Sequence, residues 1–478
     1  KSGTANFYNG VATQSLRFDD GSSANLNRIQ GSGNRRTFTW SSWVKRSSIS
    51  AIQFLACWQN TAEGSSYDAL DILAGGNLRY YINGASGSYH ITTQLFRDTS
   101  AWYHICLAVD TTQGTASNRI KIYVNGEQIT SFGTATYPSQ NYDAWANLSG
   151  RVATIGSHVL GDTAFGTFFD GYMSETNFID GLALTPTSFG ETKNGVWIPI
   201  DTSGLTFGTN GYRLKFDQVG VGTASTSTIG ADTSGNTNHW TSSGIVASDC
   251  AMPDSPENNF ATLNILNYSS ASATMSEGNL AHTSSSPHIS AVSTMALPKS
   301  GKYYWEVRLN NTSTNGSNSI GLARVNFDAT SAIFFGSANG VSIYGSTGAT
   351  FGDSALGVTW DKTGSATTFT AQNVIGVAYD ADGKNVKFYK NGTEIDYNIT
   401  DFDDATYDIL PAISAYGVPT NSGNVINFGQ DSTFAGAVSA GTATDANGYG
   451  LFKHAPPSGG YLALCTSNLP EPTIGANS

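Results

Sequence analysis

One strand–turn–strand pattern occurs twice in this chain, and it constrains the fold more than any other feature. Lys121–Ile129 reads Lys-Ile-Tyr-Val-Asn-Gly-Glu-Gln-Ile, and Lys387–Ile395 reads Lys-Phe-Tyr-Lys-Asn-Gly-Thr-Glu-Ile. Each copy alternates apolar positions around an Asn-Gly pair, which favours a two-residue type I′ turn between antiparallel strands. A strand ending in Asp precedes each copy, at Ile105–Asp110 and Val374–Asp380. The same three-strand ribbon in each half predicts two β-sandwich domains in tandem.

The composition fits many short strands joined by tight turns. The chain has 478 residues, too many for one core, and it is 39% hydrophobic and 12% aromatic, which provides ample core. Glycine accounts for 53 residues, and almost no segment shows the 3.6-residue period of a helix. We therefore expect an all-β protein whose two sandwiches are jelly rolls.

The charge balance and hydropathy exclude two classes of partner. The net charge is −12, and no cluster of Lys and Arg offsets it locally. Such a chain repels phosphates, so we expect no nucleic-acid binding. No run of 18 apolar residues occurs, and we expect no membrane insertion.

Composition changes along the chain suggest four parts. Residues 1–200 are predicted as the first sandwich and 201–258 as a bridging segment. Residues 259–430 are predicted as the second sandwich. Residues 431–478 form a Gly- and Pro-rich C-terminal segment, a composition that favours extended docking or a junction.

Acidic residues next to predicted strand ends could hold a hard cation, because calcium prefers carboxylate and carbonyl oxygens on loops. The candidate ligands are Asp19, Asp20, Asp162, Asp170, Asp380 and Asp382. The alternative is that aspartates such as those in Asp380-Ala-Asp-Gly only cap their own turns. Calcium is therefore a candidate cofactor, and the sequence establishes no cofactor.

Aromatic side chains in predicted loops could stack on the C–H faces of sugar rings. The candidates are Tyr80, Tyr81, Tyr89, Tyr142, Trp145, Tyr344 and Tyr407. The alternative is that these rings belong to the core, as most aromatic residues of a sandwich do.

Catalytic motifs are absent from the sequence. A glycosidase needs two carboxyl groups at a set separation, but no Glu-x-Asp-x-Glu or Glu-x-Asp-x-x-Glu run occurs. His-Glu-x-x-His, Gly-x-Ser-x-Gly and P-loop motifs are also missing, and the seven histidines are scattered. We therefore expect a non-enzymatic protein.

Each half resembles a known sandwich family. The first half resembles the laminin-G/concanavalin-like family in Phe38–Lys45, Trp102–Asp110, the first hairpin and Phe169–Glu175. The second half resembles a SPRY domain in Gly301–Val307, Ile320–Ala323, Val374–Asp380, the second hairpin and Ile426–Gln430. The first resemblance implies a calcium site at the rim of the sandwich.

The whole arrangement resembles structural proteins of tailed bacteriophages, particularly those of marine hosts. The phrases Asp254–Asn264, Ala455–Cys465 and Asn468–Pro472 carry this resemblance. It implies a tail fibre or tail-associated adhesin on the virion surface, assembled in the host cytoplasm as a homo-oligomer with other virion proteins, whose loops recognise host glycans. Two alternatives stay open: an architectural virion subunit (capsid decoration or tail assembly), and a polysaccharide depolymerase, which the missing carboxylate pair disfavours.

Overall fold

The chain folds into two compact units, Lys1–Glu257 and Asn258–Ser478, and each is a β-sandwich. The computed structural model describes residues 7–59, 66–82, 87–160, 163–268, 273–284, 289–310, 318–329, 340–345, 347–352, 359–361, 367–400, 402, 407–415 and 422–470. Within these ranges no helix is long or apolar enough to cross a membrane. The short helical turns are η3 (Ala116–Asn118), η4 (Pro186–Ser188), η5 (Ala247–Asp249) and η7 (Thr466–Asn468).

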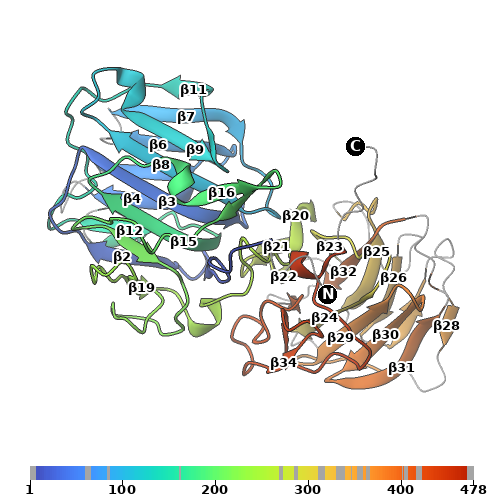
Figure 1. Ribbon diagram of the computed structural model, residues 1–478. Coiled ribbons are helices and arrows are strands. Elements are labelled where there is room, and N and C mark those ends of the chain that lie inside the picture. Colours follow the sequence, from blue (N-terminus) through green and yellow to red (C-terminus); the bar gives the residue numbers. More distant parts are fainter. Residues whose placement is uncertain are drawn as a thin grey trace. The chain divides into compact units, whose positions relative to one another are not determined.

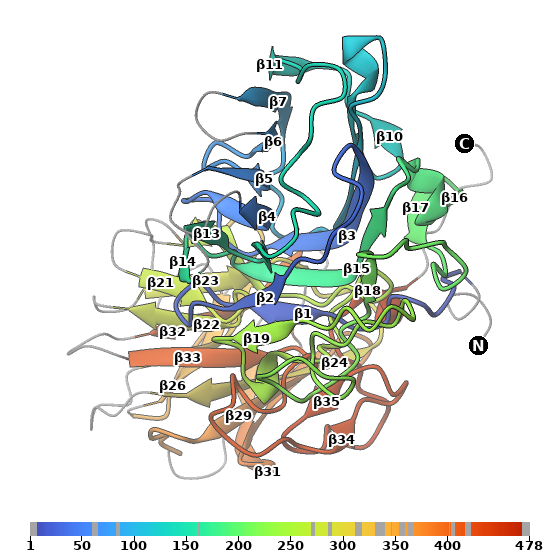
Figure 2. The ribbon, with the colours of Figure 1, turned by 90° about the vertical axis from the view of Figure 1, so that its left-hand side faces the viewer.

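The first unit stacks two antiparallel sheets (Figure 1). One sheet has the order β1 (Leu16–Phe18), β15 (Gly171–Asp180), β3 (Thr37–Arg46), β8 (Tyr103–Asp110), β9 (Ile120–Val124), β10 (Glu127–Gln128), and β18 (Tyr212–Leu214) also pairs with β15. The other has the order β11 (Phe132–Ala135), β7 (Ser88–Leu95), β6 (Asn77–Ile82), β5 (Tyr67–Ile72), β4 (Gln53–Gln59), β12 (Val152–Ile155), β2 (Asn25–Ile29), β19 (Thr241–Ser243). Figure 2 shows β4 to β7 following one another in one layer. Two hairpins are separate: β13 (His158–Leu160) with β14 (Ala164–Gly166), and β16 (Gly190–Lys193) with β17 (Val196–Pro199).

The second unit also has two antiparallel sheets. The first has the order β20 (Leu263–Tyr268), β23 (Ile289–Ser293), β32 (Ile409–Ala415), β25 (Ser319–Arg324), β26 (Gly340–Tyr344), β27 (Ala349–Phe351). The other has the order β21 (Ala273–Ser276), β22 (Ala281–Ser284), β33 (Ser422–Asn427), β24 (Lys302–Leu309), β29 (Val374–Asp380), β30 (Asn385–Lys390), β31 (Thr393–Thr400), β28 (Thr359–Asp361). A short hairpin joins β34 (Ala443–Thr444) to β35 (Leu451–Phe452). The predicted all-β fold with two sandwiches is confirmed.

Strand alternation explains each core. In β9, Ile120, Ile122 and Val124 face the core between the sheets, whereas Lys121 and Tyr123 lie on the outer face. The same period of two places Trp305 and Val307 of β24 in the core of the second unit. Burial of these apolar side chains is the main force that holds the two sheets of each unit together.

Both predicted Asn-Gly turns have the expected backbone. Asn125 and Gly126 have φ of 49° and 86°, and Asn391 and Gly392 have φ of 50° and 81°. Positive φ at both central residues defines a type I′ turn, which matches the twist of the flanking strands. Each Asn side chain also accepts a hydrogen bond from the preceding strand, from the His104 N–H at 2.8 Å and the Val374 N–H at 2.9 Å. The turn is therefore built in the same way in both units.

The segment predicted as a bridge, 201–258, lies in the first unit as far as Glu257. Its strands β18 and β19 extend the two sheets, and Trp240 enters the core. Two buried ion pairs fix it, Arg17–Asp249 at 2.8 Å and Lys45–Asp254 at 2.8 Å. Ion pairs between residues more than 200 positions apart leave no local pattern in the sequence. The segment, which has little regular alternation, was therefore predicted as a bridging segment.

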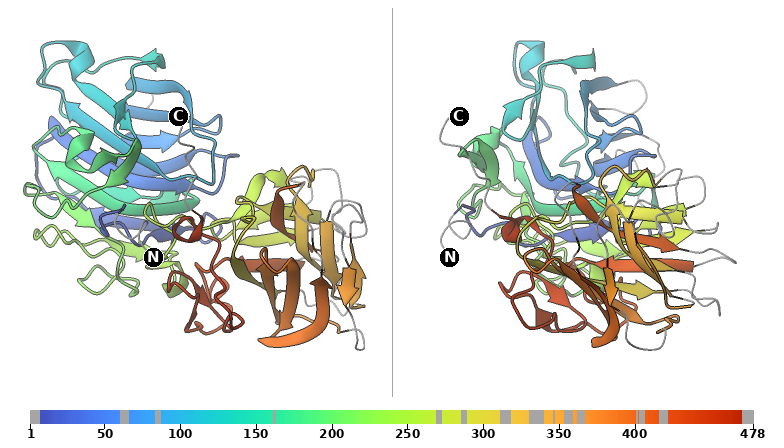
Figure 3. Two further views of the ribbon diagram at one scale, coloured as in Figure 1. Left: turned by 45° about the vertical axis from the view of Figure 1, so that its right-hand side comes forward. Right: turned by 90° about the vertical axis from the view of Figure 1, so that its right-hand side faces the viewer.

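The C-terminal segment also packs on its own unit. Phe434 and Leu464 lie in the core of the second sandwich, and Phe452 and Tyr461 cluster with Tyr304 of β24. Figure 3 shows this segment in red beside the yellow and orange strands of the second unit. As far as residue 470, it is a covering layer of the sandwich.

Candidate functional site

Three carboxylates meet at one end of the first sandwich. Asp19 and Asp20 follow β1, and Asp170 precedes β15. Because Phe18 pairs with Gly171 in the antiparallel register, Asp19 and Asp170 occupy neighbouring positions across the two strands. One carboxylate oxygen from each of the three residues lies within 4.8 Å of the others. The sequence named these residues at two separate places, and the strand register brings them together.

The arrangement of this carboxylate cluster (Asp19, Asp20 and Asp170) fits a calcium ion. Calcium binds 6 to 8 oxygens at roughly 2.3–2.6 Å, so oxygens on opposite sides of one ion are about 5 Å apart. Asp19 and Asp170 are buried, and like charges placed close together across strands repel each other. Desolvation and the charge of Asp19 raise the pKa of Asp20. A divalent cation would relieve this repulsion and clamp the β1–β2 turn to the start of β15.

The other predicted metal ligands are placed differently. Asp380 pairs with the Lys302 ammonium at 2.8 Å and accepts the Gly383 N–H at 2.7 Å. Burial raises the pKa of Asp380, but these two partners outweigh it, and the net shift is downward. Asp382 accepts the Gly301 N–H at 3.1 Å. These contacts agree with the turn-forming alternative, and Asp162 lies outside the described residues.

A row of tyrosines crosses the outer face of the eight-stranded sheet of the first unit, the sheet that contains β5, β6 and β7. Tyr81 of β6 pairs in register with Tyr89 of β7, and their rings stack at 5.7 Å. Tyr67 of β5 meets Tyr81 edge-on at 5.2 Å. Tyr67 and Tyr89 are half-buried, so part of each ring is exposed to solvent. We call Tyr67, Tyr81 and Tyr89 the tyrosine row.

A buried ion pair adjoins the tyrosine row. The Arg79 guanidinium lies 4.6 Å from the Tyr81 ring centroid and donates two hydrogen bonds to Asp71, at 3.0 and 2.5 Å. Burial raises the pKa of Asp71 to about 6, and Arg79 opposes this shift. Stacking rings beside a charged, hydrogen-bonding pair are the groups that sugar recognition uses.

Strand alternation separates the predicted aromatic residues of the first unit. Tyr80 was predicted in or beside a loop as a ligand candidate, but it lies within β6 and is fully buried in the core, because neighbouring residues of a strand face opposite sides. Tyr142 and Trp145 are half-buried and pack against the same core. Tyr67, the first residue of β5, was not among the predicted residues, although its spacing of two from Ala69 places both on the outer face.

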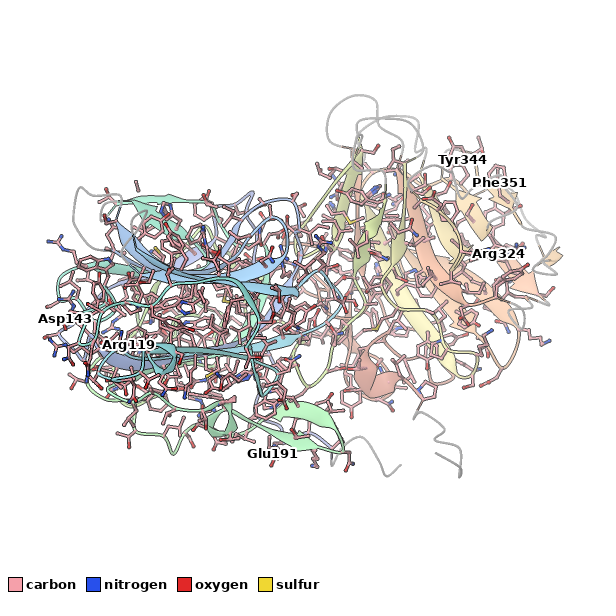
Figure 4. The ribbon with its side chains drawn as sticks, turned by 90° about the horizontal axis from the view of Figure 1, so that it is seen from above. Arg119, Asp143, Glu191, Arg324, Tyr344 and Phe351 are labelled. Atoms are coloured by element: carbon pink, nitrogen blue, oxygen red, sulfur yellow. The ribbon has the colours of Figure 1, made fainter. Side chains whose placement is uncertain are left out.

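The two predicted tyrosines of the second unit lie apart from the repeated ribbon. Tyr344 of β26 contacts Phe351 of β27 edge-on at 6.3 Å (Figure 4). The Arg324 guanidinium lies 4.1 Å from the Tyr407 ring centroid. Both tyrosines are half-buried.

Two buried glutamates of the sheets, Glu175 and Glu306, have structural roles. Glu175 pairs with Arg213 at 3.1 Å. Glu306 accepts the N–H groups of Lys453 and His454, both at 2.8 Å. Burial raises the pKa of Glu306 to about 7, against the effect of these donors. Each carboxyl group is thus committed to holding a segment against a sheet.

These observations define two successive β-sandwiches, and each matches a family model. Residues 18–188 match the concanavalin A-like lectin/glucanases superfamily, and residues 302–431 match the SPRY domain. The chain is therefore an all-β protein with a concanavalin A-like domain and a SPRY domain.

Similar solved structures come from varied sources. A candidate carbohydrate-binding protein from Bacteroides ovatus is 17% identical with a TM-score of 0.32, and the match covers 49% of this chain and 59% of that one. The SPRY domain of human HERC1 is 15% identical with a TM-score of 0.28, covering 34% and 96%. A heptameric SAP-like pentraxin from Limulus polyphemus is 17% identical with a TM-score of 0.28, covering 36% and 76%. No curated protein matches the sequence.

Proposed function

We propose that this chain is a non-enzymatic glycan-binding protein whose concanavalin A-like domain recognises surface polysaccharides. The tyrosine row carries this proposal, because the partly exposed rings of Tyr67 and Tyr89 pack on the buried Tyr81 beside the Asp71–Arg79 pair on one sheet face. Sugar rings bind such a face through their C–H groups, and polar neighbours bind the hydroxyls.

Calcium has a supporting role in this proposal. An ion on Asp19, Asp20 and Asp170 would supply positive charge and cross-link two chain segments at the rim. Asp19, Asp20 and Asp170 lie close together at the ends of β1 and β15, and the ion would reduce the repulsion between their carboxylates. Calcium would then increase the stability of the first unit.

The biological setting that we propose is the surface of a bacteriophage particle, as a tail fibre or tail-associated adhesin. The resemblance of Asp254–Asn264 and Ala455–Cys465 to phage structural proteins supports it. Weak single sites would gain avidity from many copies on one particle. Labelling intact particles with an antibody against the chain tests this setting, and labelling only of disrupted particles would contradict it.

Titration calorimetry of the full chain with bacterial surface polysaccharides tests glycan binding. Tyr89→Ala should weaken binding about fivefold to tenfold, because loss of a stacked ring costs roughly 1–1.4 kcal/mol. Tyr449→Ala is the matched control, since Tyr449 is 37% exposed and lies in the other unit. Binding that is identical in both variants would exclude the tyrosine row, and no binding by the folded chain would favour an architectural subunit.

Thermal unfolding with and without calcium tests the ion. Calcium should raise the melting temperature of the first unit, since a ligand of the folded state stabilises it. Asp170→Asn keeps the side-chain shape but removes a charge, so it should abolish the calcium effect. An equal calcium effect in this variant would contradict the site.

A further inference from the structure

A polar hollow lies on the outer face of the other sheet, away from the tyrosine row. Its volume is about 210 Å³, and the lining residues that matter for its chemistry are Ala108, Asp110, Asn118, Lys121, Tyr123 and Thr185. At about 30 Å³ per water molecule, it holds roughly seven waters or one small polar ring. It is too small for an oligosaccharide but large enough for one sugar residue.

The strand register explains why the hollow forms. Ala108 of β8 pairs with Lys121 of β9, and both face outward because Leu107 and Ile122 face the core. The small Ala108 side chain leaves space above the sheet and forms the floor of the hollow. The loop at Leu184 and Thr185 forms a wall beside it. A depression therefore stays open between the lysine stem, the Tyr123 side chain and this loop.

The loop between β8 and β9 is held firmly around the hollow. The Arg119 guanidinium, labelled in Figure 4, donates to the carbonyls of Gln113, Gly114 and Pro138 at 2.9, 3.0 and 2.7 Å. Asp110 accepts hydrogen bonds from Thr112 Oγ1 at 2.5 Å and Gln113 Nε2 at 2.6 Å. These donors orient the Asp110 carboxylate, which stays ionised and also lines the hollow, so the hollow keeps its shape without a ligand.

The positive charge in the hollow is available to a ligand. Among the residues that the structure describes, no carboxylate pairs with Lys121, and no group hydrogen-bonds the side-chain amide of Asn118. Lys121 therefore offers three charged donors, and Asn118 offers donors and an acceptor. Together with the Thr185 hydroxyl, these groups match a carboxylate and hydroxyls arranged on one ring.

In the second copy of the ribbon, the lysine equivalent to Lys121 has an ion-pair partner, and the surface beside it is covered. Lys387 occupies the place of Lys121 opposite Ala378, and its ammonium pairs with Glu394 at 2.9 Å. Phe452 and Tyr461 of the C-terminal segment cover Ala378. In the first copy Gln128 stands where the second copy has Glu394. The first copy lacks the ion pair at its lysine and the aromatic cover, and its Asp110 lines the same hollow without pairing with Lys121.

We propose that this hollow binds one carboxylate-bearing sugar residue, such as a hexuronic acid unit of an acidic polysaccharide, with Lys121 on the carboxylate. The proposal rests on the glycan-binding function of this domain and adds a second, calcium-independent subsite with its own ligand class. Sugar is favoured over an acidic peptide because Asn118, Thr185 and the Tyr123 ring surround the lysine with groups that suit a hydroxylated ring.

Titration calorimetry of the full chain in EDTA with methyl glucuronide and methyl glucoside tests the proposal. The glucuronide should bind at least about tenfold more tightly, because a charge-assisted hydrogen bond is at stake. N-acetylglutamate serves as the peptide-like carboxylate and should bind at least about tenfold more weakly than the glucuronide. Equal binding of glucuronide and glucoside, or of glucuronide and N-acetylglutamate, would overturn the proposal.

Three variants of the hollow sharpen the test, and each is checked for folding by its thermal melt. Lys121→Gln should remove the preference for glucuronide, and Gln128→Glu should do the same by supplying the internal anion that Lys387 has. Ala108→Val should fill the floor and abolish binding of both sugars, and valine suits a strand. Lys387→Gln is the matched control and should change nothing. Unchanged glucuronide binding in Lys121→Gln or Gln128→Glu would refute the assignment.

The outcomes separate this subsite from the proposed function. Tyr89→Ala should weaken polysaccharide binding but leave glucuronide binding in EDTA unchanged. Polysaccharide binding without glucuronide binding would reject the hollow alone. Absence of both, from a folded chain, would reject the glycan-binding function as well.

Discussion

The two units build the same ribbon but cover its turn with different residues. In the first unit Gly126 lies under Trp197, and a Cβ atom there would be 2.5 Å from the Trp197 ring carbon Cε3. In the second unit Gly392 lies under His454, and a Cβ atom there would be 2.9 Å from the His454 Nδ1. Each covering residue comes from a segment outside the ribbon. The repeated sequence therefore sets the turn, and the surrounding chain decides what covers it.

The units also differ in how they hold their irregular segments. The first unit uses side-chain ion pairs, Arg17–Asp249 and Lys45–Asp254, with the second pair almost completely buried. In the second unit Glu306 instead accepts backbone N–H groups of the covering C-terminal segment. A buried ion pair depends on both partners, whereas a carboxylate that accepts backbone donors depends on one side chain. We therefore expect the first unit to be more sensitive to single substitutions.

The largest effect is expected from Lys45→Met in the first unit. It leaves the buried Asp254 carboxylate without its cation, which costs about 3–5 kcal/mol. Trp102 donates to the same carboxylate at 3.2 Å, so its fluorescence should report the change during urea unfolding. The double variant Lys45→Met with Asp254→Leu should recover much of the loss; a double variant as unstable as the single would contradict the ion-pair explanation.

The two turn glycines should differ in their tolerance of alanine. Positive φ alone costs an alanine about 1–2 kcal/mol at each site. Gly126→Ala should cost roughly 2–4 kcal/mol because it also displaces the Trp197 ring, and Gly392→Ala should cost less because its Cβ atom overlaps less with His454. Urea unfolding of both variants measures this difference, and equal losses would show that the covering residues do not matter.

Glu306→Gln should loosen the C-terminal segment of the second unit. Glutamine replaces one acceptor oxygen by an amide that faces a backbone N–H, which costs on the order of 1–3 kcal/mol. Hydrogen exchange of the Lys453 and His454 amides should accelerate, and the first unit should be unaffected. Unchanged exchange at these two amides would show that the carboxylate does not hold the segment.

The smallest effect concerns acid stability, which both units share. Burial lowers the pKa of His90 in the first unit and of His282 in the second to about 4. Below about pH 6.5 the unfolded chain takes up a proton that the folded chain cannot bind until near pH 4, so stability falls as pH falls through this window.

Replacement of either histidine tests this acid effect. His90→Phe should make the first unit about 1–2 kcal/mol less sensitive to a change from pH 7.5 to pH 5, and His282→Phe should do so for the second. Thermal melts at the two pH values measure the effect. A steeper loss of stability in either variant would contradict the assigned direction.

Part of the candidate site could be predicted from the sequence. Asp19, Asp20 and Asp170 were identified as possible ligands because carboxylates follow or precede strands, but their meeting depends on the pairing of Phe18 with Gly171. Tyr81 and Tyr89 were identified by residue type, whereas Tyr80 could be assigned to the core only once β6 had a defined inner face. Residue type indicates the chemistry, and register decides which groups share a surface.

The sequence by itself determined the all-β class and the two Asn-Gly hairpins, because period-two alternation and positive φ at Asn-Gly are local properties. Only the tertiary structure decided that Asp254 pairs with Lys45 and that the hollow beside Lys121 stays open. These outcomes depend on segments that are far apart in the chain and are brought together by burial of the sandwich cores. Local conformational preferences do not determine these long-range contacts, since many different strand pairings satisfy the same preferences equally well.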